Sequence, residues 1–140
     1  MKLEFLASGS RDTPLIRFYG SDVEPLRELS RQVEQLSLQT LAEVEVHNIP
    51  DVTAISGCQL KLGVVAKRPR SLITRKTVGS SEFQAFATCE DWLTVHFLLE
   101  PLLEPTNGVG FQWLLGGDAR GLLSESSIAL LVSTHSDGNW

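Results

Sequence analysis

Apolar positions in the first half of the chain follow first the spacing of a strand and then the spacing of a helix. Residues 15–19 form an apolar run that one arginine interrupts and that Gly20 follows, which is typical of a strand. Between residues 22 and 38, apolar side chains recur at intervals of three and four residues, namely Leu26, Leu29, Val33 and Leu36. This spacing places them on one face and predicts an amphipathic helix.

A polar signal precedes this helix, and two more strand patterns follow it. Ser21 and Glu24 have the spacing of a capping box, in which two side chains satisfy free backbone N–H groups at the start of a helix. Residues 43–47 alternate between polar and apolar side chains, and residues 58–66 place alternate apolar side chains on one face. Both segments are therefore predicted to be half-buried strands.

The second half of the chain presents the same order of elements. Residues 82–87 alternate as a strand does, and Thr88 and Asp91 have capping-box spacing before a helix predicted over residues 90–103. This helix is apolar on more than one side. Two further strands are predicted after it, over residues 110–115 and residues 126–134.

The two halves match when they are offset by 67 residues. This offset places Ile16 on Phe83, and it also aligns the capping positions and the apolar positions of the two helices. The match predicts a duplicated strand–helix–strand–strand unit, with one copy over residues 15–66 and the other over residues 82–134. Because the copies share almost no identical residues, two units that are similar by chance are an equally strong alternative.

One unit of this kind has a single helix on a short sheet and cannot close its own core. We therefore expect a single domain of the α+β class over residues 1–140, with residues 67–81 as the connector between the units. The predicted architecture is a mainly antiparallel sheet of about six to seven strands, with both helices on one face, formed by edge-to-edge pairing of the two units.

The composition agrees with one folded domain. The chain has 140 residues, of which 42% are hydrophobic and 21% charged, and this excludes a disordered tail, a collagen-like chain and a disulfide scaffold. Cys58 and Cys89 are too few for a disulfide framework, and the first residues lack the apolar segment of a signal peptide. The apolar runs are also too short to span a membrane. We therefore expect a cytoplasmic protein with reduced thiols.

Charge is distributed unevenly along the chain, whose net charge is −5. Residues 67–76 contain no acid and five bases, namely Lys67, Arg68, Arg70, Arg75 and Lys76. Residues 77–140 contain one base and eight acids. A nucleic-acid partner is not expected, because the bases form one short stretch rather than a broad face. The stretch is either a hydrated connector or a contact for a phosphate or an acidic partner.

Known catalytic and cofactor-binding motifs are absent from the sequence. There is no phosphate-binding glycine loop, no G-x-S-x-G and no zinc or calcium spacing, so no catalytic residue, metal or cofactor is predicted. Cys89 is the nearest approach to a nucleophile, because the start of a helix favours a thiolate. His96 lies seven residues further on. It is therefore about 10 Å away along a helix, which is too far for direct proton transfer.

Four residues of the second half are candidate binding residues, namely Trp92, His96, Phe111 and Trp113. Phe111 and Trp113 are alternate residues of one predicted strand, whereas Trp92 and His96 belong to the helix expected to pack on it. Rings in this arrangement form either part of the core or a ring-lined pocket between helix and strand.

The sequence therefore favours a non-catalytic protein-interaction module, whose acidic second half binds a partner with a basic surface. Two alternatives stay open: a small-ligand-binding domain with an aromatic pocket, and a small thiol hydrolase that uses Cys89. The apolar character of the helix over residues 90–103 also predicts a homo-oligomer, unless the sheet and the connector bury that helix.

Overall fold

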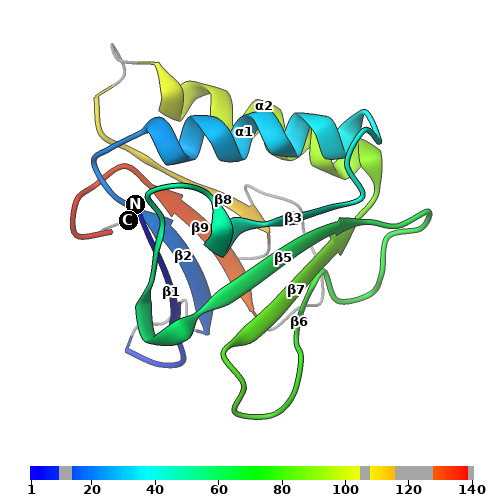
Figure 1. Cartoon of the computed structure of the whole chain (residues 1–140), viewed down its shortest axis with the longest axis horizontal. Helices are drawn as coiled ribbons and strands as arrows, with labels where there is room; N and C mark the ends of the chain where they lie inside the picture. The colour runs from blue at the N-terminus through cyan, green and yellow to red at the C-terminus, as the bar shows by residue number, and fades with distance from the viewer. Residues whose placement is uncertain (10–13, 105–107, 116–127, 139–140) are drawn as a thin grey trace.

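Two helices lie side by side over two β-sheets (Figure 1). The computed structural model describes residues 1–9, 14–104, 108–115 and 128–138, and within these ranges the α-helices are α1 (Glu24–Ser37) and α2 (Cys89–Leu103). Two short 3-10 helices, Val46–Asn48 and Ile55–Gly57, also lie there. Figure 1 shows that α1 and α2 run in opposite directions. Neither of them has the length and apolarity that a membrane-spanning helix needs.

The described strands form two sheets, which we call sheet A and sheet B. Sheet A has the strand order β4–β1–β2–β9–β8, and sheet B has the order β3–β5–β7–β6. The strands are β1 (Lys2–Leu6), β2 (Leu15–Tyr19), β3 (Glu43–Glu45), β4 (Thr53–Ala54), β5 (Gln59–Val64), β6 (Ile73–Arg75), β7 (Glu82–Ala87), β8 (Phe111–Leu115) and β9 (Ala129–Ser133). Residues 126 and 127 of the predicted last strand lie outside the described residues.

The predicted α+β class is confirmed, but the prediction of one mainly antiparallel sheet of six to seven strands is wrong. The described strands form two mixed sheets, of five and four strands. Two central pairs are parallel, β2 with β9 and β5 with β7. A parallel pair requires a long connection between its strands, so its partners are distant in sequence. Residue alternation identifies a strand without indicating its partner, and the prediction failed for this reason.

Each sheet takes strands from both halves of the chain. The first long strand of one half pairs in parallel with the last strand of the other half, as β2 does with β9 and β7 does with β5. That last strand then pairs in antiparallel fashion with a preceding strand of its own half, β9 with β8 and β5 with β3. The two halves thus use the same pattern of pairing, while the duplication itself stays a prediction.

The two helices begin in different ways. At α2, Asp91 N–H donates to Thr88 Oγ1 at 3.2 Å and Thr88 N–H donates to Asp91 Oδ2 at 3.4 Å, so the predicted capping box is confirmed. At α1 the predicted box is wrong, because the helix begins at Glu24 after Val23 as the N-cap residue, and the Val23 side chain makes no cap hydrogen bond. The carboxylate of Asp22 instead accepts a hydrogen bond from Glu24 N–H at 3.1 Å.

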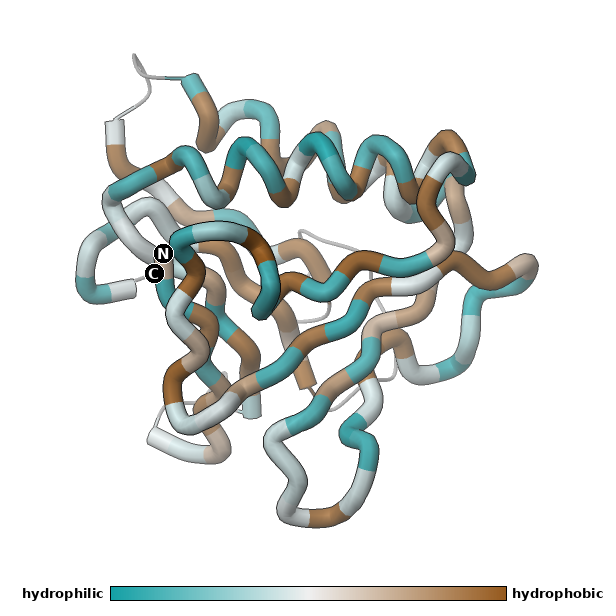
Figure 2. Tube along the Cα trace, in the orientation of Figure 1, coloured by the Kyte–Doolittle hydropathy of each residue, from teal (hydrophilic) through white to brown (hydrophobic). Residues whose placement is uncertain are grey.

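The main core lies between the helices and the facing sides of the two sheets. Figure 2 shows apolar residues recurring along α1 and along the strands below it. Phe5 of β1 and Phe83 of β7 join the sheets, with ring centroids 4.6 Å apart. Trp92 of α2 is fully buried, and its indole N–H donates to the Gly63 carbonyl of β5 at 2.8 Å. A Cβ on Gly63 would lie 2.4 Å from the ring of Phe86, so any larger residue there would displace that ring.

Sheet A is also buried on the face that points away from this core. Ile16 and Phe18 of β2 belong to the main core, whereas Leu15 belongs to a second cluster with Trp113, Ala129 and Leu131. A strand that is buried on both faces carries apolar side chains at successive positions. This explains why residues 15–19 form a nearly continuous apolar run.

Because each sheet needs strands from both halves, we expect fragments 1–66 and 67–140 to remain unfolded alone and to form a folded complex when mixed. Two-dimensional ¹H–¹⁵N NMR spectra would show narrow amide dispersion for each fragment and native dispersion after mixing. Native dispersion in either fragment alone would contradict the dependence of each sheet on both halves.

Candidate functional site

Helix α2 exposes large apolar side chains to solvent, although its opposite side forms part of the core. Trp92, Val95 and Leu99 are buried, whereas Leu93 is 41% exposed and Phe97 is 56% exposed. An isolated exposed apolar residue is common in folded proteins. Leu93 and Phe97, however, are four residues apart and therefore lie next to each other on one helix face. Together they form an apolar patch of the kind that often marks a protein contact.

Three carboxylates continue the line of this patch. Glu90, Leu93, Phe97, Glu100 and Glu104 follow one another at intervals of three, four, three and four residues, and all five are exposed. We call these five residues the outer stripe of α2. Helix α2 contains no lysine or arginine. A hydrogen bond from its own backbone N–H lowers the pKa of Glu90, which keeps this carboxylate ionised. The outer stripe therefore has an apolar centre and acidic ends.

His96 connects the outer stripe to α1. Its Nδ1 atom lies 3.1 Å from Ser30 Oγ and 3.2 Å from the Ser30 carbonyl oxygen. Its Nε2 atom lies 3.4 Å from a carboxylate oxygen of Glu34 and 3.3 Å from one of Glu100. The imidazole thus holds the two helices together, and it fixes the carboxylate of Glu34 beside the outer stripe.

The structure does not bring the four predicted binding residues together. Trp92 belongs to the main core, whereas Trp113, which is 6% exposed, packs on the far face of sheet A. Phe111 is 45% exposed, and His96 lies between the helices. The free space beside Trp92 is about 10 Å³, which is no larger than one water molecule. The space beside Trp92, between α2 and β8, is therefore too small for a ligand.

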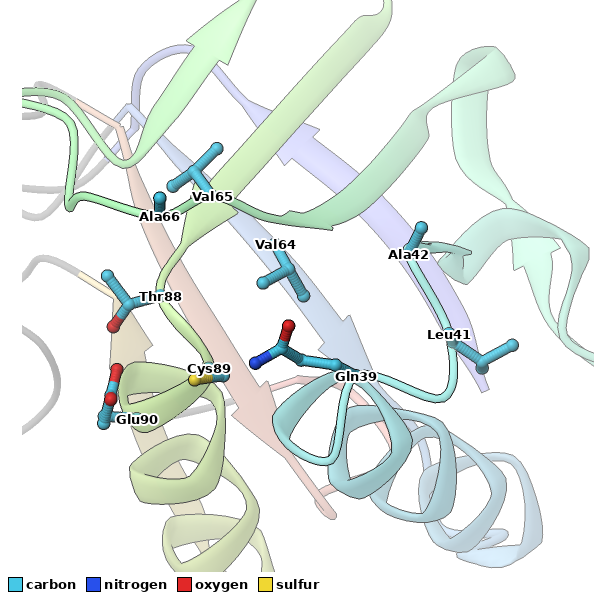
Figure 3. Close-up of a pocket in the computed structure, with 9 residues that line it drawn as sticks. All are labelled: Gln39, Leu41, Ala42, Val64, Val65, Ala66, Thr88, Cys89 and Glu90. Carbon is cyan, nitrogen blue, oxygen red and sulfur yellow. The ribbon is translucent and has the colours of Figure 1, made fainter.

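A larger cavity lies where α1 ends and α2 begins (Figure 3). Its volume is about 480 Å³, and its lining includes Gln39, Val64, Thr88, Cys89 and Glu90. Gln39 has a φ of +58°, which is the left-handed conformation. A residue in this conformation commonly follows the end of a helix and is usually a glycine. Figure 3 shows the Gln39 amide between Val64 and the Cys89 sulfur. The cavity is of ligand size, but it has no buried charged group in its lining to orient a ligand.

Neither cysteine has the surroundings of a nucleophile in the described part of the chain. The lining of the cavity around Cys89 contains no histidine. His47 accepts a hydrogen bond from Leu60 N–H at 3.2 Å, and His96 is held between the helices. Burial raises the pKa of Cys58 to about 11, with a smaller contribution from Glu4. The group within hydrogen-bond reach of the Cys89 thiol is the carboxylate of Glu90, whose lowered pKa makes it a weak base, so this geometry gives little support to thiol hydrolysis.

Metal ligands are likewise not gathered in the described ranges, where no three residues among His, Cys, Asp and Glu could hold one ion. Several bases of the predicted basic connector form contacts with other parts of the same chain. Arg68 forms a two-pronged ion pair with Asp91, whose Oδ2 lies 2.9 Å from Arg68 Nε. The guanidinium of Arg75 stacks 4.8 Å above the Phe5 ring, and Lys76 pairs with Glu82 at 3.2 Å.

The other two bases of the predicted connector, Lys67 and Arg70, are exposed. At least three of the five bases, Arg68, Arg75 and Lys76, thus contact other groups of this chain. Among them, Arg68 attaches the connector to the first turn of α2.

The prediction of candidate residues missed all five residues of the outer stripe, including Leu93 and Phe97. Their spacing is visible in the sequence, but the buried residues Trp92, Val95 and Leu99 have the same spacing of three and four. The apolar residues of both lines have spacing compatible with a core-facing side, so that spacing alone did not distinguish them. The glutamates that flank Leu93 and Phe97 in the exposed line are the signal that could have ranked the two lines, because an unpaired glutamate is almost never buried.

Replacing Arg68 with alanine should lower the free energy of unfolding by about 1 kcal/mol at pH 7, because Asp91 is 5% exposed and loses its partner. Arg68 holds the pKa of Asp91 below 3.8, so the contribution of the pair is present above about pH 4 and is lost as the pH falls through the lower folded value. Urea unfolding from pH 7 to pH 2.5 would measure this difference.

In that series, Lys67→Ala serves as the control, since Lys67 is an exposed base of the same connector. A difference between Arg68→Ala and the wild type that does not shrink at low pH would rule out the ion pair as its source.

The two thiols should differ in reactivity. Cys58 is buried with a pKa of about 11, whereas Cys89 is partly exposed beside a cavity. Iodoacetamide at pH 8 should therefore modify Cys89 and leave Cys58 unmodified in the folded protein, because the thiolate is the reactive form. Peptide mass spectrometry would measure both rates, with guanidinium-unfolded protein as the control in which the rates converge. Equal rates in the folded protein would contradict the burial of Cys58.

Comparison of the chain with protein-family models, with curated proteins and with solved structures found no match. The case for a function therefore rests on the residues and the geometry described above. Within that geometry, the outer stripe of α2 combines exposure, apolar area and uncompensated charge.

Proposed function

We propose that the protein is a protein-interaction module and that it binds its partner through the outer stripe of α2. The observation that supports this function best is the exposure of Leu93 and Phe97 on a helix whose other side forms part of the core. Burying one such side chain completely contributes about 1.5–3 kcal/mol to association. An exposed aromatic residue at the centre of a helix face, with polar residues around it, has the composition of an interface hot spot.

The arrangement of α2 on the rest of the fold also suits a binding role. The helix is held at its first turn by a capping box and by Arg68, and along its length by Trp92 and His96. A helix face that is already ordered loses little conformational entropy when a partner binds. The cavity beside Cys89 offers a ligand no buried charge, and its lining contains no histidine that could act as a base for the thiol, so binding of a protein is the better supported function.

The test compares two aspartate substitutions on the immobilised full chain. Phe97→Asp places a charge at the centre of the outer stripe. Val78→Asp places the same charge at a fully exposed apolar residue between β6 and β7. Both are surface changes, so each should alter the free energy of unfolding by about 0.5 kcal/mol or less. Proteins retained from a cell lysate on each immobilised variant would be identified and quantified by mass spectrometry. Folding of the variants would be checked by circular dichroism.

We expect at least one protein to be retained by the wild type and by Val78→Asp, and to be reduced about tenfold or more by Phe97→Asp, which corresponds to a loss of about 1.4 kcal/mol. Leu93→Asp should give a reduction in the same direction. If every retained protein binds the Phe97→Asp variant as well as the wild type, the outer stripe is not the binding surface and the proposal is overturned.

A further inference from the structure

We infer that the partner segment bound by the outer stripe of α2 is a basic amphipathic helix, whose apolar side contacts Leu93 and Phe97 and whose lysine or arginine side chains pair with Glu90, Glu100 and Glu104. This inference rests on the proposed function, since it names the partner of the same surface. It is argued from three features of that surface: its residue spacing, its charge and the place of its charges around the apolar centre.

The spacing of the outer stripe favours a helix as the bound element. Its five residues follow one another at intervals of three, four, three and four, from Glu90 to Glu104. Alternating intervals of three and four residues form the seam along which two helices pack side by side. From Glu90 to Glu104, the C-cap of α2, the seam covers fifteen residues, and its fourteen steps correspond to about 21 Å, which a partner helix of about four turns would cover.

The charge of the outer stripe favours a basic partner. On α1, by comparison, Glu28 pairs with Arg31 at 2.5 Å and Glu24 pairs with Arg27 at 3.5 Å. The buried carboxylate of α2, Asp91, pairs with Arg68.

The carboxylates of the outer stripe differ from these, because no ion pair joins Glu90, Glu100 or Glu104 to a lysine or arginine in the described part of the chain. The titratable groups near Glu100 are the imidazole of His96, at 3.3 Å, and through it the carboxylate of Glu34. Those beside Glu90 are the Cys89 thiol and the Asp91 carboxylate. The face as a whole therefore carries uncompensated negative charge, which attracts cationic side chains and accelerates their association.

The position of these carboxylates on both sides of the apolar centre disfavours a second copy of the chain as the partner of the outer stripe. If two outer stripes packed on each other about a two-fold axis, each copy would present the same carboxylates to the other. Like charges brought together in this way oppose association. The two exposed apolar side chains, Leu93 and Phe97, are also a small apolar centre for a homodimer, whose interfaces are large and strongly hydrophobic. A basic helix uses the same apolar centre and turns the repulsion into attraction.

The test selects partners without assuming their sequence. A displayed library of randomised helical peptides, about 16 residues long to cover the stripe, is selected on the full wild-type chain and counter-selected on the Phe97→Asp variant. We expect the enriched peptides to carry net positive charge and apolar residues at intervals of three and four. Enrichment of neutral or acidic peptides would overturn the inference while the proposed function stands. If no peptide distinguishes the wild type from Phe97→Asp, the proposed function fails and the inference fails with it.

A charge series on one enriched peptide completes the test. Changing Glu90, Glu100 and Glu104 together to glutamine should weaken its binding about tenfold or more and reduce its dependence on salt, as measured by fluorescence anisotropy. The matched control removes three carboxylates from sheet B, by changing Glu43, Glu45 and Glu82 to glutamine, and should leave the affinity within about twofold. Equal losses in both triple variants would show attraction to net charge alone and would overturn the inference.

Sedimentation equilibrium of the wild type and of Phe97→Asp tests whether a second copy of the chain binds the outer stripe. We expect both proteins to have the mass of one chain at micromolar concentration. A wild-type dimer that Phe97→Asp dissociates would identify a second copy as the occupant, and this result would overturn the inference of a basic partner while it supports an interaction function.

Discussion

The rotation of α2 about its own axis decides which of its apolar side chains meet the solvent, and two buried polar contacts fix that rotation. A buried indole N–H needs an acceptor, and Trp92 donates to the carbonyl of Gly63. One residue earlier, the nearly buried carboxylate of Asp91 is held by Arg68 and by the capping box. Because neighbouring helical residues point about 100° apart, fixing Trp92 inward places Phe97 outward. The outer stripe of α2 is a consequence of these contacts.

The two sheets provide the support that these contacts need. Gly63 belongs to β5, which pairs with β7 in parallel and with β3 in antiparallel fashion. The ring of Phe86 lies against Gly63, where a Cβ would be 2.4 Å away. The carbonyl that receives the Trp92 indole is therefore part of a strand that is held on both edges. Since β5 and β7 come from different halves of the chain, the position of α2 depends on the whole domain.

Charge in this protein separates groups that hold the fold from groups that face outward. The basic connector is largely internal in its role, since Arg68 fastens α2, Arg75 covers the Phe5 ring and Lys76 pairs with Glu82. The carboxylates of the outer stripe have no such partner among the described residues. An acidic surface around exposed apolar side chains combines long-range attraction with short-range burial. These are the two contributions that a selective protein contact requires.

The sequence by itself determined the helices, most strands, the capping box of α2 and the α+β class, because periodicity and capping depend on residues close together in the chain. It also determined that the helix over residues 90–103 is apolar on several sides. Only the tertiary structure decided that β2 pairs with β9 and β5 with β7, since alternation does not identify a partner. It likewise decided that Trp113 and Trp92 lie on opposite sides of sheet A, and that Phe97 rather than Trp92 faces the solvent. The reason is the same in each case: apolar residues on two sides of one helix, or on two faces of one strand, have similar local preferences, and long-range contacts select between them.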